Sequence, residues 1–195
     1  MISVVIPFMA KDQYPEKLNN CIGWLDRQTA KHETIVVEHD VERYIRLNEL
    51  KVAGVEFSSG KYIWFCGADF LNDDDTFLER MVEKIECGFD VILPTYISPS
   101  YGKLKVTDGA EFIKRDVFDK FNLNIKHIGI SRATMPFVWW CLNNLRWYVS
   151  EEFMVTVDHS GRHRANVHYP TLNECTPYYK KVVEFFKKRG LWLNS

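Results

Sequence analysis

The segment Gly60-Lys61-Tyr62-Ile63-Trp64-Phe65-Cys66-Gly67-Ala68-Asp69 gives the clearest indication of the fold class of this chain. Residues 62–66 are apolar on both faces, which is typical of a strand buried within a parallel sheet. Glycine and aspartate follow at once, at positions 67 and 69. The pattern therefore predicts a buried strand with a carboxylate just beyond its end.

Similar apolar runs lie on both sides of this segment. We expect strands at residues 2–6, 34–37 and 90–94, with helices at 17–28, 44–52 and 73–86. Alternation of strands and helices predicts an α/β protein with a doubly wound, mostly parallel central sheet. Ligands bind beyond the carboxyl ends of such strands. We therefore expect three segments to meet at one edge of the sheet: Pro7-Phe8, Glu38-His39-Asp40 and Gly67-Ala68-Asp69.

The second half of the chain alternates less regularly. Strands are expected at 110–114 and 153–157, and helices at 116–121, 136–145 and 177–189. The length of 195 residues suits one domain, and 46% hydrophobic residues suffice for a packed core. The net charge of −1 gives no sign of a basic surface for nucleic acid.

The cysteines and the N-terminus indicate a reducing compartment inside the cell. The five cysteines are scattered and form no CxxC pair, which disfavours a zinc site and suits a reduced intracellular protein. The sequence shows no signal peptide and no long apolar span. We therefore expect a cytoplasmic protein.

Several segments, in this order, resemble motifs of the family 2 glycosyltransferases and their GT-A relatives. They are residues 3–7, 21–28, 35–38, 58–65, 90–92, 109–115 and 157–161. The resemblance covers roughly residues 1–165 and implies one GT-A domain over residues 1–195. Its parts would be a nucleotide-binding half (1–94), an acceptor half (95–165) and a C-terminal tail with a helix (166–195).

The resemblance also implies an enzyme, of hexosyltransferase type. Such an enzyme moves a sugar from a UDP- or GDP-linked donor to a hydroxyl group on a glycan, protein or lipid. It uses a divalent cation, Mn²⁺ or Mg²⁺, because a hard cation on oxygen ligands offsets the charge of a departing diphosphate. Asp69 matches the last aspartate of the DxD metal motif, with Ala68 before it, and His159 matches a late metal-binding histidine.

Four further residues match positions that contact the donor nucleotide in this family. Glu38 matches the acid that holds the base or ribose, and Pro7 and Phe8 match the loop that lines the nucleoside. Lys51 lies where the family often has a basic residue near the nucleobase or phosphates.

Two departures from the family pattern affect the chemistry. Gly67 replaces the first aspartate of the DxD motif, and residues 122–150, where the catalytic base is expected, contain no Asp or Glu. An inverting transfer needs a base for the acceptor proton. We assign this role to Asp158, with Glu151 and Glu152 as alternatives, and a retaining mechanism without a protein base stays open.

Each assignment has a simpler structural alternative. Asp69 would cap a turn, while Glu38 and His159 would be exposed polar residues. The acidic run at 73–75 suits the start of a helix better than a metal site. Trp139 and Trp140 would stack on an acceptor sugar or pack in the core. The basic and aromatic helix at 177–189 would dock on the domain or rest on an anionic membrane.

Two other functions fit the same residues. A nucleotidyltransferase also uses strand-end carboxylates and Mg²⁺, although the loop after the first strand lacks the expected glycines. A non-catalytic nucleotide- or glycan-binding module would explain both departures from the motif.

Overall fold

The computed structural model describes residues 1–9, 15–39, 47–98, 102–104, 110–120 and 145–157. Strands and helices alternate through the first half of the chain, as the sequence predicts. In chain order the elements are β1 (Ile2–Met9), α1 (Pro15–Leu25), β2 (His32–His39), α2 (Leu47–Glu56), β3 (Tyr62–Phe65), β4 (Phe70–Leu71), α3 (Phe77–Glu86), β5 (Val91–Ser98), β6 (Gly102–Leu104), β7 (Phe112–Lys114), α4 (Arg115–Lys120) and β8 (Trp147–Val157).

The strands form one mixed sheet in the order β2-β1-β3-β7-β5-β8-β4, with β6 beside β5. β1 runs parallel to both β2 and β3, and β5 runs parallel to β8. β7, β6 and β4 are antiparallel to their neighbours. β6 follows β5 after a connection too short for a crossover, so antiparallel pairing is the available geometry. The predicted α/β class is confirmed, with parallel pairing in the core of the sheet.

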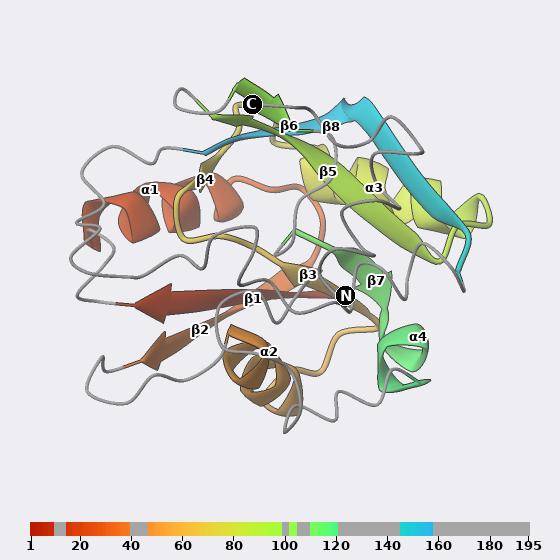
Figure 1. The fold of residues 1–195 in the computed structure, drawn as a ribbon, viewed down its shortest axis with the longest axis horizontal. Coiled ribbons are helices and arrows are strands. Elements are labelled where there is room, and N and C mark those ends of the chain that lie inside the picture. The colour runs from red at the N-terminus through yellow and green to blue at the C-terminus, as the bar shows by residue number, and fades with distance from the viewer. Residues whose placement is uncertain (10–14, 40–46, 99–101, 105–109, 121–144, 158–195) are drawn as a thin grey trace, which may run out of the picture.

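Helices cover both faces of the sheet, with α1 and α3 on one side and α2 and α4 on the other (Figure 1). Side chains of α1 and α3 share a hydrophobic core with Ile2, Val4 and Trp64. On the other face α2 packs against β1 and β2. The helix comes so close there that a Cβ at Gly54 would collide with the side chain of Val5.

The strand predicted at residues 62–66 is the centre of the core. It is observed as β3, and all four of its residues are buried. The ring of Trp64 lies 5.7 Å from that of Trp24 and 5.6 Å from that of Phe77, which joins β3 to α1 and α3. Aromatic pairs at this spacing add to the stabilisation from buried area.

Four strands are longer than the sequence predicts: β1, β2 (predicted at 34–37), β5 (predicted at 90–94) and β8. β1 continues through Pro7 to Met9, because pairing with β3 ends at Val5 and the missing N–H of Pro7 falls where β1 has only β2 beside it. β8 begins at Trp147 rather than at residue 153, because its first part pairs with β5 from Val91 onward. The helix predicted at 136–145, apart from its last position, and the helix predicted at 177–189 lie outside the described residues.

Candidate active site at the ends of the parallel strands

The ends of β1, β2 and β3 meet at one edge of the sheet, as expected. Phe8 is the register partner of Glu38, and the amide of Cys66 donates to the carbonyl of Val5 at 2.9 Å. Ala68 is fully buried in the same hydrophobic core as Phe8. The segment that ends in Asp69 therefore lies beside the end of β1.

A tight turn follows β3 and explains the glycine in the degenerate motif. The amide of Phe70 donates to the carbonyl of Gly67 at 3.0 Å. A Cβ added at Gly67 would collide with the Phe70 ring and lie 3.0 Å from Oδ1 of Asp69. The aspartate that the DxD motif has at this position does not fit the turn as it stands.

Asp69 lies in an interior environment, with 3% of its surface exposed. The charge of Asp69 acts on the buried thiol of Cys66, whose sulfur atom lies 3.7 Å from that of Cys21. Burial raises the pKa of the Cys66 thiol well above its usual range, and the contact with Cys21 and the charge of Asp69 add to the effect. Little water screens the carboxylate here, so a nearby cation would interact with it more strongly than at a solvated surface.

β4 and β8 bring the late part of the chain to this edge. Phe70 pairs with Val157 and Leu71 with Thr156, in antiparallel register. Asp69 directly precedes Phe70, and Asp158 directly follows Val157. The predicted residues Asp158 and His159 themselves lie outside the described residues.

The residues predicted to contact the nucleotide differ in exposure. Glu38 is exposed, Pro7 is half-buried, and Phe8 is buried, with 5% of its surface exposed. Lys51 is 2% exposed, and its ammonium group donates to Oε2 of Glu111 at 2.8 Å. The same ammonium lies 4.5 Å from the centre of the Phe65 ring, so Lys51 has interior partners on the α2 face of the sheet.

Glu152, one of the alternative bases, is tied to neighbouring side chains. The hydroxyl of Tyr148 donates to its carboxylate at 2.9 Å, and Lys84 lies 3.4 Å away. The hydrogen bond from Tyr148 and the charge of Lys84 hold the pKa of Glu152 below its usual range, although partial burial acts against them. A lowered pKa makes this carboxylate a weaker base.

The donor set only partly fits a divalent metal in the part of the chain that the structure describes. Asp69 supplies the hard oxygen ligand that Mn²⁺ and Mg²⁺ prefer. No group of three or more His, Cys, Asp or Glu side chains gathers around one point within those residues. A complete site would therefore need ligands from outside them or from the donor phosphates.

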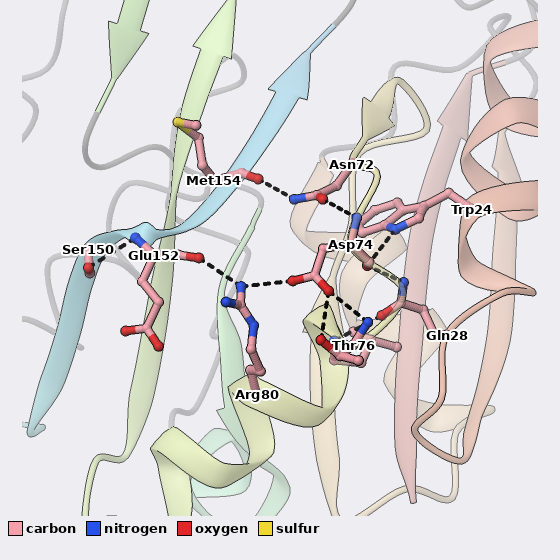
Figure 2. Close-up of polar contacts among 10 residues, drawn as sticks. Trp24, Gln28, Asn72, Asp74, Thr76, Arg80, Ser150, Glu152 and Met154 are labelled. Atoms are coloured by element: carbon pink, nitrogen blue, oxygen red, sulfur yellow. Dashed lines mark hydrogen bonds and ion pairs between the residues drawn. The ribbon is translucent and has the colours of Figure 1, made fainter.

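Sequence reasoning missed two sets of contacts near this edge. Glu111, the partner of Lys51, is 60 residues away from it and lies in a different element, so no spacing rule links the two. Asn72, Asp74 and Arg80 join the start of α3 to β8 (Figure 2). The acidic run at 73–75 lies just before α3, which begins at Phe77 rather than at residue 73. The contacts of Asn72 and Arg80 with β8 leave no local sequence signal.

No helix in the described residues is both long and apolar enough to cross a membrane. The helix predicted at 177–189, for which docking on the domain and contact with a membrane surface were the two alternatives, lies outside those residues.

Comparison with known proteins identifies the family. Residues 25–137, more than half of the chain, match the model of glycosyl transferase family 2. The chain belongs to this family. No curated protein sequence matches it.

Solved structures show the same fold at low sequence identity. TarS 1-349 from S. aureus matches with a TM-score of 0.62 and 13% identity, covering 80% of this chain and 60% of that one. The mannosyltransferase PcManGT from Pyrobaculum calidifontis matches with a TM-score of 0.60 and 11% identity, covering 83% of this chain and 58% of that one. The catalytic domain of Drosophila β1,4-galactosyltransferase 7 matches with a TM-score of 0.62 and 18% identity, covering 93% of this chain and 78% of that one. The chain thus spans about 60% of the length of the first two matched chains, TarS 1-349 and PcManGT.

Proposed function

We propose that this chain is a glycosyltransferase that moves a hexose from a UDP- or GDP-linked donor to a hydroxyl group of a glycan, protein or lipid acceptor. Membership of glycosyl transferase family 2 supports the reaction class. Structures that share the fold were solved with UDP-GlcNAc, with GDP-Man and Mn²⁺, and with manganese, UDP-Gal and xylobiose. Their ligands define the donor classes to test first.

The observation that carries the proposal is the pairing of Phe70 with Val157. Consecutive Cα atoms are about 3.8 Å apart, so residue 158 stays within one residue step of Val157. Asp69, which is buried, directly precedes Phe70 on the facing strand β4. This supports a shared site to which Asp69 and His159 contribute metal ligands.

Donor binding in this proposal uses the neighbouring strand ends. The end of β1 at Pro7 and Phe8 would line the nucleoside, and the exposed carboxylate of Glu38 would accept hydrogen bonds from ribose or base. Asp69 and His159 would hold Mn²⁺ or Mg²⁺, which when bound would offset the negative charge on the diphosphate leaving group.

The acceptor reacts through its hydroxyl oxygen. In an inverting transfer this oxygen forms a bond to the anomeric carbon, while the bond from that carbon to the diphosphate oxygen breaks. The hydroxyl proton goes to a base, which we assign to Asp158. Lys51 remains proposed for contact with the donor, although its ammonium already has Glu111 as a partner.

The test measures metal-stimulated hydrolysis of UDP- and GDP-sugars by the purified chain. Asp69→Asn keeps the shape of the side chain and removes its charge, so we expect it to abolish the Mn²⁺-stimulated rate. Asp73→Asn is the matched control, because Asp73 is an exposed carboxylate four positions further on. Equal rates for Asp69→Asn and the parent chain would remove Asp69 from the mechanism.

Gly67 favours one alternative, a non-catalytic module that binds a nucleotide or glycan. The turn at Gly67 excludes the first carboxylate of the metal motif. Such a module would be stabilised by UDP or GDP with Mn²⁺, by about 2.7 kcal/mol at a ligand concentration of 100 Kd, and yet show no turnover.

A further inference from the structure

A side chain just after β4 is hydrogen-bonded to the backbone of β8. Nδ2 of Asn72 donates to the carbonyl of Met154 at 2.5 Å, and Oδ1 accepts from the amide of Asp74 at 2.6 Å (Figure 2). Asn72 thus uses both ends of its amide to join the segment before α3 to the late part of β8.

Arg80 makes a second connection, from α3. Its Nη2 atom donates to the carbonyl of Glu152 at 2.9 Å and lies 2.9 Å from Oδ2 of Asp74 (Figure 2). Its guanidinium carbon lies 5.5 Å from the centre of the Phe153 ring. The carbonyls of residues 152 and 154 are therefore both held by side chains that come from one short stretch of the chain.

These carbonyls lie at an irregularity in β8. Pro94 of β5 pairs with Ser150, whereas the next residue, Thr95, pairs with Met154. Residues 151–153 thus have no partner on β5, and they form a bulge. The position of a bulge determines which later residues face each other across the sheet.

The hydrophobic pattern of β8 leaves part of this choice open. Phe153, Val155 and Val157 are buried, while Thr156 is exposed. A slip by one residue would bury the polar face, but a slip by two would keep every apolar side chain on the same face. Burial alone therefore does not select between the observed register and one displaced by about 6.6 Å.

Contacts of Arg80 and Asn72 distinguish the observed register of β8 from the displaced one. A carbonyl in a regular ladder bonds to the neighbouring strand, whereas the carbonyl of Glu152 lies in the bulge and bonds to Arg80. We propose that Asn72 and Arg80 are positioning residues, which fix the bulge at 151–153 and so set the register in which β8 brings the chain to Asp69. The consequence for catalysis rests on the proposed function, but the register itself does not.

Cysteine cross-linking measures the register without any need for activity. Leu71→Cys with Thr156→Cys pairs positions that face each other, and Leu71→Cys with Met154→Cys pairs positions displaced by two. Oxidation followed by peptide mass spectrometry gives the ratio of the two disulfide yields. We expect the facing pair to dominate in the parent chain, and Asn72→Ala with Arg80→Met to lower the ratio about tenfold.

Milder variants keep the test decisive if that double variant does not fold. Asn72→Asp retains the acceptor for Asp74 and removes only the donor to Met154, so it should also lower the ratio. Lys84→Met is the matched control, because Lys84 lies on the same helix and contacts the side chains of Glu152 and Tyr148 rather than a backbone carbonyl of β8. Its ratio should equal that of the parent chain.

An unchanged ratio in folded Asn72→Asp and in folded Asn72→Ala with Arg80→Met would overturn the inference. Donor hydrolysis by the same variants gives a separate result. If the parent chain binds and hydrolyses no donor, the proposed function fails, while the cross-linking ratio still decides the role of Asn72 and Arg80.

Discussion

Phe70 of β4 and Val157 of β8 are antiparallel partners, although 87 positions separate them in the chain numbering. Each is the covalent neighbour of a residue that the family resemblance assigns to the site, Asp69 before Phe70 and Asp158 after Val157. This pairing joins the segment that follows Asp69 to the end of β8 through backbone geometry, and it does not depend on any bound ligand.

The turn after β3 predicts that restoring the family motif will not restore the metal site. Gly67→Asp should destabilise the fold by about 1–3 kcal/mol, because the new Cβ meets the Phe70 ring and the new charge lies beside Asp69. Thermal unfolding of the variant measures this loss.

Gly23 offers the matched control for this turn. It is an exposed helical residue, and a Cβ added there meets nothing within 4 Å. Gly23→Ala should therefore leave stability equal or raise it by up to about 1 kcal/mol, whereas Gly67→Ala should lower it. A Gly67→Asp protein as stable as the parent, with tighter Mn²⁺ binding, would contradict this interpretation.

The buried ion pair predicts a large effect of a single change at Lys51. Lys51→Met leaves the carboxylate of Glu111 in the interior without its ammonium partner, so stability should fall by about 3–5 kcal/mol. Lys61→Met removes the exposed partner of Glu86 and should change stability little. Urea unfolding compares the two variants.

A double variant tests the predicted role of Lys51 in donor binding. Lys51→Met combined with Glu111→Leu removes both charges and should recover part of the lost stability. If Lys51 contacts the donor, this double variant should still bind UDP or GDP more weakly than the parent chain. Full nucleotide affinity in the double variant would restrict Lys51 to a structural role.

Asp74 predicts a loss of stability in acid. Burial, the largest single influence, raises the pKa of Asp74, but hydrogen bonds from Thr76 and the charge of Arg80 outweigh it and lower the pKa below its ordinary value of 3.8. A lowered pKa in the folded state contributes stability above the unfolded value, and this contribution disappears as the pH falls through the folded value. The urea concentration at the midpoint of unfolding should therefore decrease as the pH falls below about 4.

Asp74→Asn isolates this contribution. The variant should be less stable than the parent chain at neutral pH, and the difference should shrink as the pH falls below about 4. Glu33→Gln is a useful comparison, because hydrogen bonds from Ser3, Ser59 and Gly60 outweigh burial and lower the pKa of Glu33 in the same direction. A difference between parent and Asp74→Asn that stays constant with pH would contradict the assignment.

The cysteines predict a selective pattern of alkylation. The thiolate is the reactive form, and burial raises the pKa of the Cys66 thiol, while Cys87 is exposed. Iodoacetamide at neutral pH should modify Cys87 well before Cys21 or Cys66, as read by peptide mass spectrometry. Rapid labelling of Cys66 in the folded chain would show that the Asp69 environment opens to solvent.

The sequence was sufficient for the α/β class and for the meeting of the strand ends, because apolar runs and the polar residues after them are local signals. The extension of β1 through Pro7 was missed, since it depends on how far β3 pairs with β1. The reason for Gly67 is the position of the Phe70 ring, which becomes visible only when the turn is folded. The pairing of Lys51 with Glu111 and the bulge in β8 arise from contacts distant in sequence.

Calorimetric titration of UDP or GDP into the chain, with and without Mn²⁺, tests the central claim most directly. We expect Mn²⁺ to strengthen nucleotide binding in the parent chain and in Asp73→Asn, and Asp69→Asn to lose this gain, with affinity at least about tenfold weaker. Equal Mn²⁺-dependent affinity in Asp69→Asn and the parent chain would contradict a cation held by Asp69 against the donor diphosphate.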